Sequence, residues 1–204
     1  MSKAVIEVGA NRGTDTVKLA KKYEGIAIYA IEPTPKLYKD LTEKFRENAQ
    51  VTVFQLAIDN KDGVATFNIA GHHDWGCSSL HEFTEKEHLF GQWKHRPDFY
   101  FNDKCEVKTS RLDTFIEAQG ITEVEFLWID SQGHDFTVLK SLGKKLSIIK
   151  EGVCETAWGA NLYQQTDNNV EDVTKWLIDN GFIVTKVETA HGHEANVYFK
   201  RQEK

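Results

Sequence analysis

The chain has 204 residues, 40% of them hydrophobic, and a formal net charge of −6. This length fits one domain with a buried core, and the interspersion of basic with acidic residues argues against a nucleic-acid partner. The three cysteines are odd in number and lack CxxC spacing, which argues against a disulfide framework and a zinc knuckle. The first predicted strand leaves no room for a signal peptide, and no apolar run reaches membrane-spanning length, so we expect a cytoplasmic protein.

Short apolar runs alternate with stretches of helical periodicity. The runs are typical of buried parallel strands, and they predict strands at 4–8, 26–31, 51–57, 124–129 and 148–154. Helical spacing of apolar residues predicts helices at 14–24, 35–47, 113–119 and 134–142. This alternation indicates an α/β fold in which a mainly parallel sheet has helices on both faces. Ligands bind such sheets at the carboxyl ends of the strands.

The last third of the chain predicts a helix followed by two strands. An apolar stripe at 170–177 has helical spacing, and Gly181 ends it as a C-terminal cap. Strand-like runs follow at 182–187 and 195–200. We expect them to form a terminal antiparallel hairpin.

Two segments break the alternation. Residues 58–70 predict a small hairpin that turns at 61–63, because Asp-Gly is a common hairpin turn. Residues 71–104 show no sustained period and contain seven aromatic Trp, Tyr and Phe residues. A segment of this length is usually a functional loop, so we expect an insert or lid within a single domain spanning 1–204. The alternative is a secondary core over the edge of the sheet.

A glycine turn follows the first predicted strand, in the stretch VIEVGANRGTDT. Gly9 and Gly13 stand where the chain must bend and where backbone must approach a ligand. A dinucleotide-binding turn would have its second glycine where this chain has Asn11, and a third glycine that is absent here. With Glu7 at the end of the strand, the turn suits a ligand with a cationic amine and no pyrophosphate.

An acid also ends the second predicted strand, Glu32 in the stretch YAIEPTP. A carboxylate at this place can accept two hydrogen bonds from a ribose diol. A ribose at Glu32 and an amino acid at the glycine turn together describe S-adenosylmethionine. The alternative is that the turn is only the glycine-rich first turn that any parallel α/β sheet carries.

Seven stretches follow one another between about residues 5 and 156: EVGANRGTDT, IEPTP, LAIDNKDG, GCSSL, RLDTF, FLWIDSQGHDFTVLKSLG and VCET. In this order they resemble the FkbM-like family of S-adenosylmethionine-dependent methyltransferases. The resemblance implies a Rossmann-like class I methyltransferase fold with a C-terminal antiparallel hairpin strand. It also implies methylation of a hydroxyl on a sugar, glycan or natural product.

The resemblance also implies a cofactor site, carried over residue by residue. It places at the S-adenosylmethionine the residues Glu7, Gly9, Asn11, Gly13, Glu32, Ala57, Asp59 and Asp130. Ala57 and Asp59 would lie near the adenine, and Asp130 would face the methionine end and the acceptor.

Two departures from the family pattern change the expected site. Relatives carry sequence before the first strand that helps to cover the cofactor, so we expect residues 71–104 or a second subunit to close the site instead. Position 132 is often Glu in the family and is Gln132 here, which removes one charge and one candidate base.

Three residues are candidates for the base that takes the proton of an acceptor hydroxyl: Asp130, His134 and Glu155. Methyl transfer is an in-line displacement in which positioning matters most, and a base beside the oxygen adds about 10²–10⁴-fold. Each candidate has a structural alternative. Asp130 could only bind the cofactor amine or cap the following helix, His134 could be a solvated residue at the helix start, and Glu155 could pair with Arg111.

We expect no bound metal, because the histidine-rich stretches 72–74 and 191–194 fit no fixed ligand motif. Two other functions stay open. One is a nicotinamide-dependent oxidoreductase that uses Glu32 on the ribose, which the missing third glycine disfavours, and the other is a non-catalytic cofactor-binding module. The expected partner is a small-molecule or glycan acceptor, without nucleic acid or membrane, and a homodimer is an option.

Overall fold

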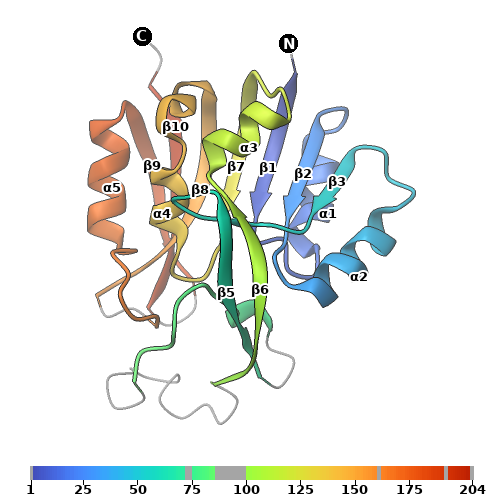
Figure 1. Cartoon of the computed structure of the whole chain (residues 1–204). Helices are drawn as coiled ribbons and strands as arrows, with labels where there is room; N and C mark the ends of the chain where they lie inside the picture. The colour runs from blue at the N-terminus through green and yellow to red at the C-terminus, as the bar shows by residue number, and fades with distance from the viewer. Residues whose placement is uncertain (1, 72–74, 86–99, 160–161, 191–192, 203–204) are drawn as a thin grey trace.

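The structure is a computed structural model that describes residues 2–71, 75–85, 100–159, 162–190 and 193–202 (Figure 1). Its centre is a sheet in the order β3-β2-β1-β7-β8-β10-β9. The strands are β1 (Lys3–Val8), β2 (Ala27–Ile31), β3 (Val51–Phe54), β7 (Glu123–Ile129), β8 (Ile149–Ala157), β9 (Phe182–Thr189) and β10 (Glu194–Arg201). The first five of these run parallel, and β10 runs antiparallel to both of its neighbours. The mainly parallel sheet and its terminal antiparallel hairpin are therefore confirmed.

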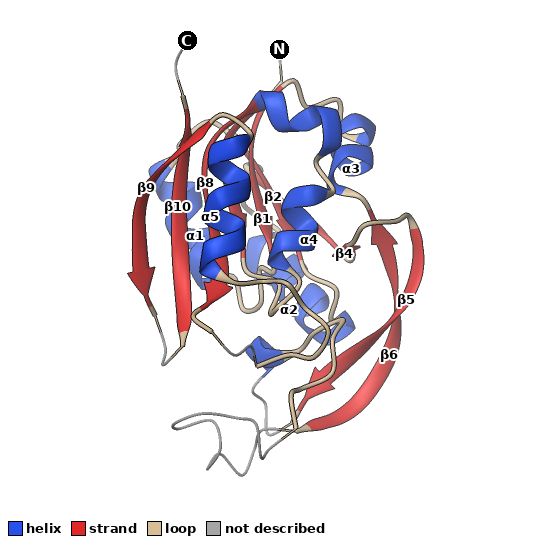
Figure 2. Cartoon of the chain, turned by 90° about the vertical axis from the view of Figure 1, so that its left-hand side faces the viewer, coloured by secondary structure: helices blue, strands red, loops and turns tan. Residues whose placement is uncertain are grey.

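Helices cover both faces of this sheet (Figure 2). They are α1 (Thr14–Lys22), α2 (Pro35–Phe45), α3 (Leu112–Ala118), α4 (Asp135–Lys140) and α5 (Val170–Asp179). Apolar side chains of α1 and α2 form one buried cluster with the sheet, and those of α3, α4 and α5 form another. Because the local apolar spacing decides which face each helix buries, all five helices lie where the sequence predicts them, with ends that differ by a few residues.

A second, smaller sheet extends past the carboxyl ends of β1 and β2 (Figure 1). It consists of β4 (Ala57–Ile58), β5 (Gly63–Ala70) and β6 (Phe101–Ser110), in the order β4-β6-β5. The predicted hairpin within 58–70 is wrong, because β4 and β5 do not pair with each other. Both pair with β6, β4 in parallel and β5 antiparallel. The predicted strand 51–57 is likewise divided between β3 and β4.

The physical reason for this pairing is an apolar cluster that β6 brings to the second sheet. Val107 and the partly buried Cys105 pack with Phe67 of β5 and Ala57 of β4. Along 105–108 the apolar Cys105 and Val107 alternate with charged residues, a pattern that indicates a strand. The sequence prediction missed this strand.

The segment 71–104 is described only in part. It contains the short 3₁₀ helix η1 (Trp75–Cys77), the residues up to 85 and the first residues of β6. Residues 72–74 and 86–99 lie outside the described residues, so the lid stays a prediction. Within the described ranges, no helix is both long enough and apolar enough to span a bilayer.

Candidate active site

A cavity of about 570 Å³, open to solvent, lies at the carboxyl ends of β1, β2 and β7. Its walls come from the turns after these strands, from the second sheet and from the segment 76–80. Of the residues expected at the cofactor, five line it: Gly9, Asn11, Glu32, Ala57 and Asp130. Three others do not belong to its lining: Glu7, Gly13 and Asp59.

The turn after β1 forms the floor of the cavity. Gly9 has a φ of 88°, and a Cβ at this position would overlap the backbone carbonyl oxygen of Asp130. The glycine is therefore required by the close approach of two turns, in addition to any approach of a ligand. Gly13 is the N-cap of α1 with a φ of 70°, and a Cβ at this position would overlap the side chains of Leu41 and Phe45, so its role is at the helix start.

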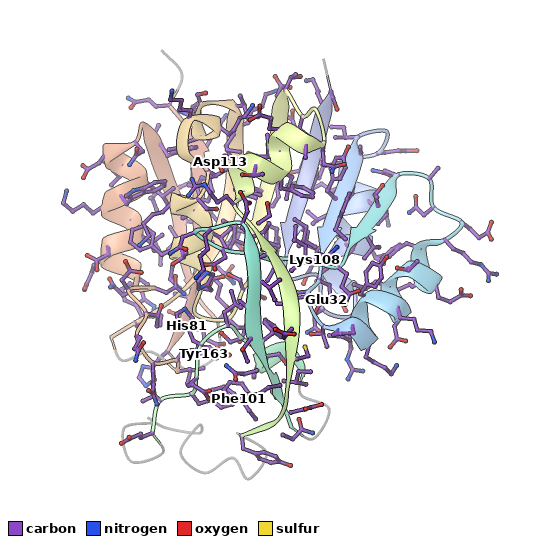
Figure 3. All side chains as sticks on the ribbon, viewed as in Figure 1. Glu32, His81, Phe101, Lys108, Asp113 and Tyr163 are labelled. Atoms are coloured by element: carbon purple, nitrogen blue, oxygen red, sulfur yellow. The ribbon has the colours of Figure 1, made fainter. Side chains whose placement is uncertain are left out.

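Glu32 lies at the end of β2 and is 4% exposed (Figure 3). Its Oε1 accepts a hydrogen bond from the Thr34 backbone N–H and its Oε2 from that of Asn11, each at 2.8 Å. Burial raises the pKa of Glu32 to about 7, although these hydrogen bonds favour the ionised form. Each oxygen keeps a second lone pair, so the carboxylate can still accept two hydroxyl groups.

Asn11 supplies a second polar group to the same part of the cavity. It has a φ of 48°, a left-handed conformation that asparagine tolerates better than most residues. Its side-chain Oδ1 is buried and has no hydrogen-bond partner within the described residues. A buried acceptor without a partner is costly, so this oxygen is suited to a hydroxyl or amide donor of a ligand.

Glu7 lies behind the glycine turn instead of in the cavity wall. Its Oε2 accepts a hydrogen bond of 2.6 Å from the Thr16 hydroxyl. Burial raises the pKa of Glu7 to about 8, with nearby Asp15 and Asp130 adding to the effect. Its contact with the amine of a cofactor stays a prediction.

Asp130 and Glu155 meet at the carboxyl ends of β7 and β8, and Gln132 joins them. The Gln132 Nε2 donates to Asp130 Oδ1 at 2.7 Å and to Glu155 Oε2 at 2.9 Å. The two carboxyl groups also contact each other, and burial raises the pKa of both. Because two carboxylates this close do not both ionise readily, the pair holds one proton in common. Asp130 and Gln132 line the cavity and Glu155 does not, so such a pair can accept or release a proton at the cavity wall through Asp130.

The pairing of Glu155 with Arg111 and the capping role of Asp130 are wrong, and binding of the cofactor amine by Asp130 stays a prediction. Arg111 pairs with Asp113, through contacts of 2.7 and 2.9 Å, and leaves Glu155 to Gln132. Asp135, instead of Asp130, holds the turn before α4. It accepts hydrogen bonds from the Ser131 backbone and hydroxyl, the Gly133 backbone and the Asn168 side chain. The sequence prediction did not assign this role to Asp135.

His134 is 8% exposed, so the solvated helix start is also wrong. Its Nε2 lies 3.0 Å from Asp59 Oδ1, and its Nδ1 lies 2.9 Å from Nε2 of His81. Both ring nitrogens thus have partners, and a role as base would require one contact to break. The hydrogen bond from His134 lowers the pKa of Asp59. His81 is a residue that the sequence prediction missed, because only the tertiary structure brings it to His134.

The expectation of no bound metal concerns the histidine-rich stretches 72–74 and 191–194. Among the described side chains, no three His, Cys, Asp or Glu residues are grouped as metal ligands. The stretch 72–74 and residues 191 and 192 lie outside the part of the chain that the structure describes.

Comparison with known proteins gives the family. The model of the methyltransferase FkbM domain matches residues 7–184. The 2-O-methyltransferase NoeI of Sinorhizobium fredii is 23% identical over 141 residues, which cover 66% of this chain and 55% of that protein. The chain thus spans about half the length of this curated relative.

Solved structures show the same fold. A methyltransferase FkbM from Methylobacillus flagellatus KT has a TM-score of 0.59 at 11% identity, covering 97% of this chain and 43% of that one. TrmK from M. capricolum, in complex with S-adenosyl-homocysteine, has a TM-score of 0.53 at 9% identity. The match covers 99% of this chain and 63% of the TrmK chain. The fold is that of Rossmann-like class I methyltransferases. Since the family model spans most of the sequence, the chain belongs to the methyltransferase FkbM domain family.

Proposed function

We propose that this protein is an S-adenosylmethionine-dependent methyltransferase that methylates a hydroxyl group of a sugar, glycan or natural product. The observation that carries the proposal is the pairing of Glu32 with Asn11 at one end of the cavity. The name of the relative, a 2-O-methyltransferase, supports oxygen as the acceptor atom. The S-adenosyl-homocysteine bound to TrmK, described there as the natural cofactor product, supports the choice of cofactor.

The residues present fit this cofactor. The Glu32 carboxylate has free lone pairs for the two ribose hydroxyls, and the unpartnered Asn11 Oδ1 can accept a further donor. Ala57, Ile58 and Phe67 line the cavity with apolar surface that suits an adenine ring. When bound, the cofactor supplies an electrophilic methyl group.

The acidic pair supplies the proton acceptor in this proposal. An acceptor hydroxyl beside Asp130 and Glu155 passes its proton to the carboxylate that is ionised, while Gln132 keeps both carboxyl groups in place. The chain otherwise contributes position and exclusion of water, which a displacement needs most.

Calorimetric titration with S-adenosylhomocysteine, NAD and NADP tests the cofactor. We expect only S-adenosylhomocysteine to bind, and Glu32→Ala to weaken its binding by about 1.5–3 kcal/mol through lost charge-assisted hydrogen bonds. Asp40→Asn, on an exposed ion pair of α2, is the control and should leave affinity unchanged. Unchanged affinity in Glu32→Ala would contradict the site, and binding of NAD would favour an oxidoreductase.

An acceptor screen tests the reaction. Labelled S-adenosylmethionine is incubated with glycans, nucleotide sugars and polyketides, and the methylated position is identified by mass spectrometry. Transfer to oxygen supports the proposal, and transfer to nitrogen or carbon contradicts it. Cofactor binding without turnover on any acceptor would favour a non-catalytic binding module.

A further inference from the structure

A short segment between β5 and β6, residues 78–81, forms one wall of the cavity. Ser78 and Leu80 line it, opposite the turn after β1. His81, which is labelled in Figure 3, follows directly. It is not part of the lining of the cavity. The position of this wall therefore depends on what holds residues 78–81 in place.

On one side, the wall segment is fastened to β5. Asn68 and Ser79 exchange two backbone hydrogen bonds of 2.8 and 3.0 Å, and the Asn68 side chain donates to the His81 carbonyl at 3.0 Å. Residues 82–84 continue into backbone hydrogen bonds with 162–164. The ends of the segment are thus held by contacts that do not titrate.

On the other side, two contacts join the wall to the turn after β7. The Ser79 hydroxyl donates to the Gln132 carbonyl at 2.7 Å. His81 Nε2 meets His134 Nδ1 at 2.9 Å, and His134 meets Asp59 through its other nitrogen at 3.0 Å. Of these two contacts, only the one between histidines changes with pH.

The distance between His81 Nε2 and His134 Nδ1 is that of a hydrogen bond, in which the two nitrogens share one proton. At 2.9 Å, one nitrogen donates and the other accepts, so at least one imidazole is neutral. If both rings were fully protonated, two N–H groups and two positive charges would face each other. The contact would then be repulsive. Of the two contacts with the turn after β7, the wall would keep only the hydrogen bond from the Ser79 hydroxyl to the Gln132 carbonyl.

The charged groups around the pair favour the state with one neutral ring. Burial, and then the charge of His134, lower the pKa of His81 from its ordinary value of 6.5. Asp59 and the more distant Asp167 act in the opposite direction on His81, as does the backbone of Gln164. Lys61 faces Asp59. The contact is therefore kept while at least one of the two rings is neutral, and it is lost only when both rings carry a proton.

We propose that His81 is a positioning residue of the cofactor cavity, which through His134 holds the wall segment 78–81 closed until both imidazoles are protonated. This rests on the proposed function, since the cavity is assigned to S-adenosylmethionine. His81 does not touch the reacting atoms. It fixes the position of Ser78 and Leu80 in the cavity wall.

The first test measures S-adenosylhomocysteine affinity by calorimetry between pH 5 and 8. Opening of the wall takes up one proton, so this contact should raise the wild-type Kd by up to about tenfold per pH unit at the acidic end of this range. His81→Gln keeps a donor near the Nε2 position but cannot titrate. The slope of its plot of log Kd against pH should therefore be smaller in magnitude than the wild-type slope by up to one. Ser79→Ala is the matched control: it should weaken binding at every pH and keep the wild-type slope.

The variant comparison separates His81 from other acids of the site. Protonation of Glu32 also weakens binding at low pH, but it contributes equally to all three proteins. A wild-type slope in His81→Gln would overturn the proposal, as would a lost slope in Ser79→Ala.

A second measurement needs no ligand. The backbone amide of residue 81 donates to the Ser79 hydroxyl at 3.0 Å, and this hydroxyl donates to the Gln132 carbonyl. The hydrogen-exchange protection factor of this amide therefore reports on the contacts between the wall and the turn after β7. Protection should fall from pH 7.5 to pH 5.5 in the wild type and stay constant in His81→Gln; equal protection in the wild type would overturn the proposal. If protection falls as expected but S-adenosylhomocysteine does not bind, the histidine contact stands and the cofactor assignment fails.

Discussion

The side chain of Gln132 donates two hydrogen bonds to two acids, which a glutamate at the same position could not do. Its amide nitrogen contacts Asp130 and Glu155, and its amide oxygen accepts from the Tyr163 hydroxyl at 2.7 Å. A glutamate would place a third carboxyl group beside the pair and would require a second proton to offset the repulsion. Because Gln132 is uncharged, the pair of Asp130 and Glu155 needs only one shared proton.

Replacement of Glu155 by glutamine tests the shared proton through the pH dependence of stability. Because burial raises the pKa of Glu155, the folded protein holds a proton that the unfolded chain releases. The free energy of unfolding should therefore fall as pH rises above about 4.3, the ordinary value for Glu, by up to about 1.4 kcal/mol per pH unit. Glu155→Gln has no such proton, so its free energy of unfolding should depend less on pH.

Urea denaturation at pH 5.5, 7.0 and 8.5 measures this difference. The control is Glu171→Gln on the exposed first turn of α5, which should follow the wild-type curve. If the free energy of unfolding falls equally with rising pH in Glu155→Gln and in the wild type, Asp130 and Glu155 do not share a proton.

The turn between β7 and α4 is the element on which the site depends most. Gln132 and Gly133 follow each other with φ angles of 55° and 85°, a left-handed conformation that glycine adopts readily and that is costly for Gln132. The buried Asp135 offsets this cost by accepting four hydrogen bonds, three of them from the turn itself. The turn thereby places Asp130 and His134 in the cavity wall.

Asp135→Asn should loosen this turn. An amide nitrogen would face donors in place of a carboxylate oxygen, and we expect a loss of about 2–4 kcal/mol in the free energy of unfolding. S-adenosylhomocysteine should also bind more weakly, because the turn lines the cavity. Asn168→Ala removes only one of the four donors and should cost less, about 1–2 kcal/mol. Thermal denaturation and calorimetry measure both effects, and wild-type stability in Asp135→Asn would contradict this account of the turn.

For the molecule as a whole, the decisive strand is β10. It is the last strand in the chain, lies between β8 and β9 and runs antiparallel to both, so it joins β9 to the rest of the sheet. Val197 and Phe199 point into the core shared with α3, α4 and α5. Loss of this strand's packing should affect the entire fold.

Phe199→Ala should therefore be severe. Phe199 is 2% exposed and packs edge-on against Phe182, and truncation of such a side chain costs about 3–5 kcal/mol. Tyr198→Phe is the control on the same strand. It removes one exposed hydrogen bond to Glu188 and should cost less than about 0.5 kcal/mol. Urea denaturation compares the two; a loss under about 1 kcal/mol in Phe199→Ala would contradict the placement of β10.

The sequence by itself determined the parts of the protein that depend on local pattern. Periodicity of apolar residues depends only on neighbouring side chains, so it located the five helices and the strands of the main sheet. The glycine turn after β1 and Glu32 after β2 also came from short stretches, and the parallel sheet brings them to one cavity. The series of motifs indicated the family that the family model then showed.

Only the tertiary structure decided which distant residues meet. The pairing of β4 and β5 with β6 depends on an apolar cluster from three segments, and no turn signal at 61–63 contains that information. The same holds for Glu7, which Thr16 binds behind the turn, and for His81, which meets His134 from 53 positions away in the chain. Local periodicity fixes the direction of a side chain within its own element, but its partner depends on how separate elements pack, and that is a property of the folded chain alone.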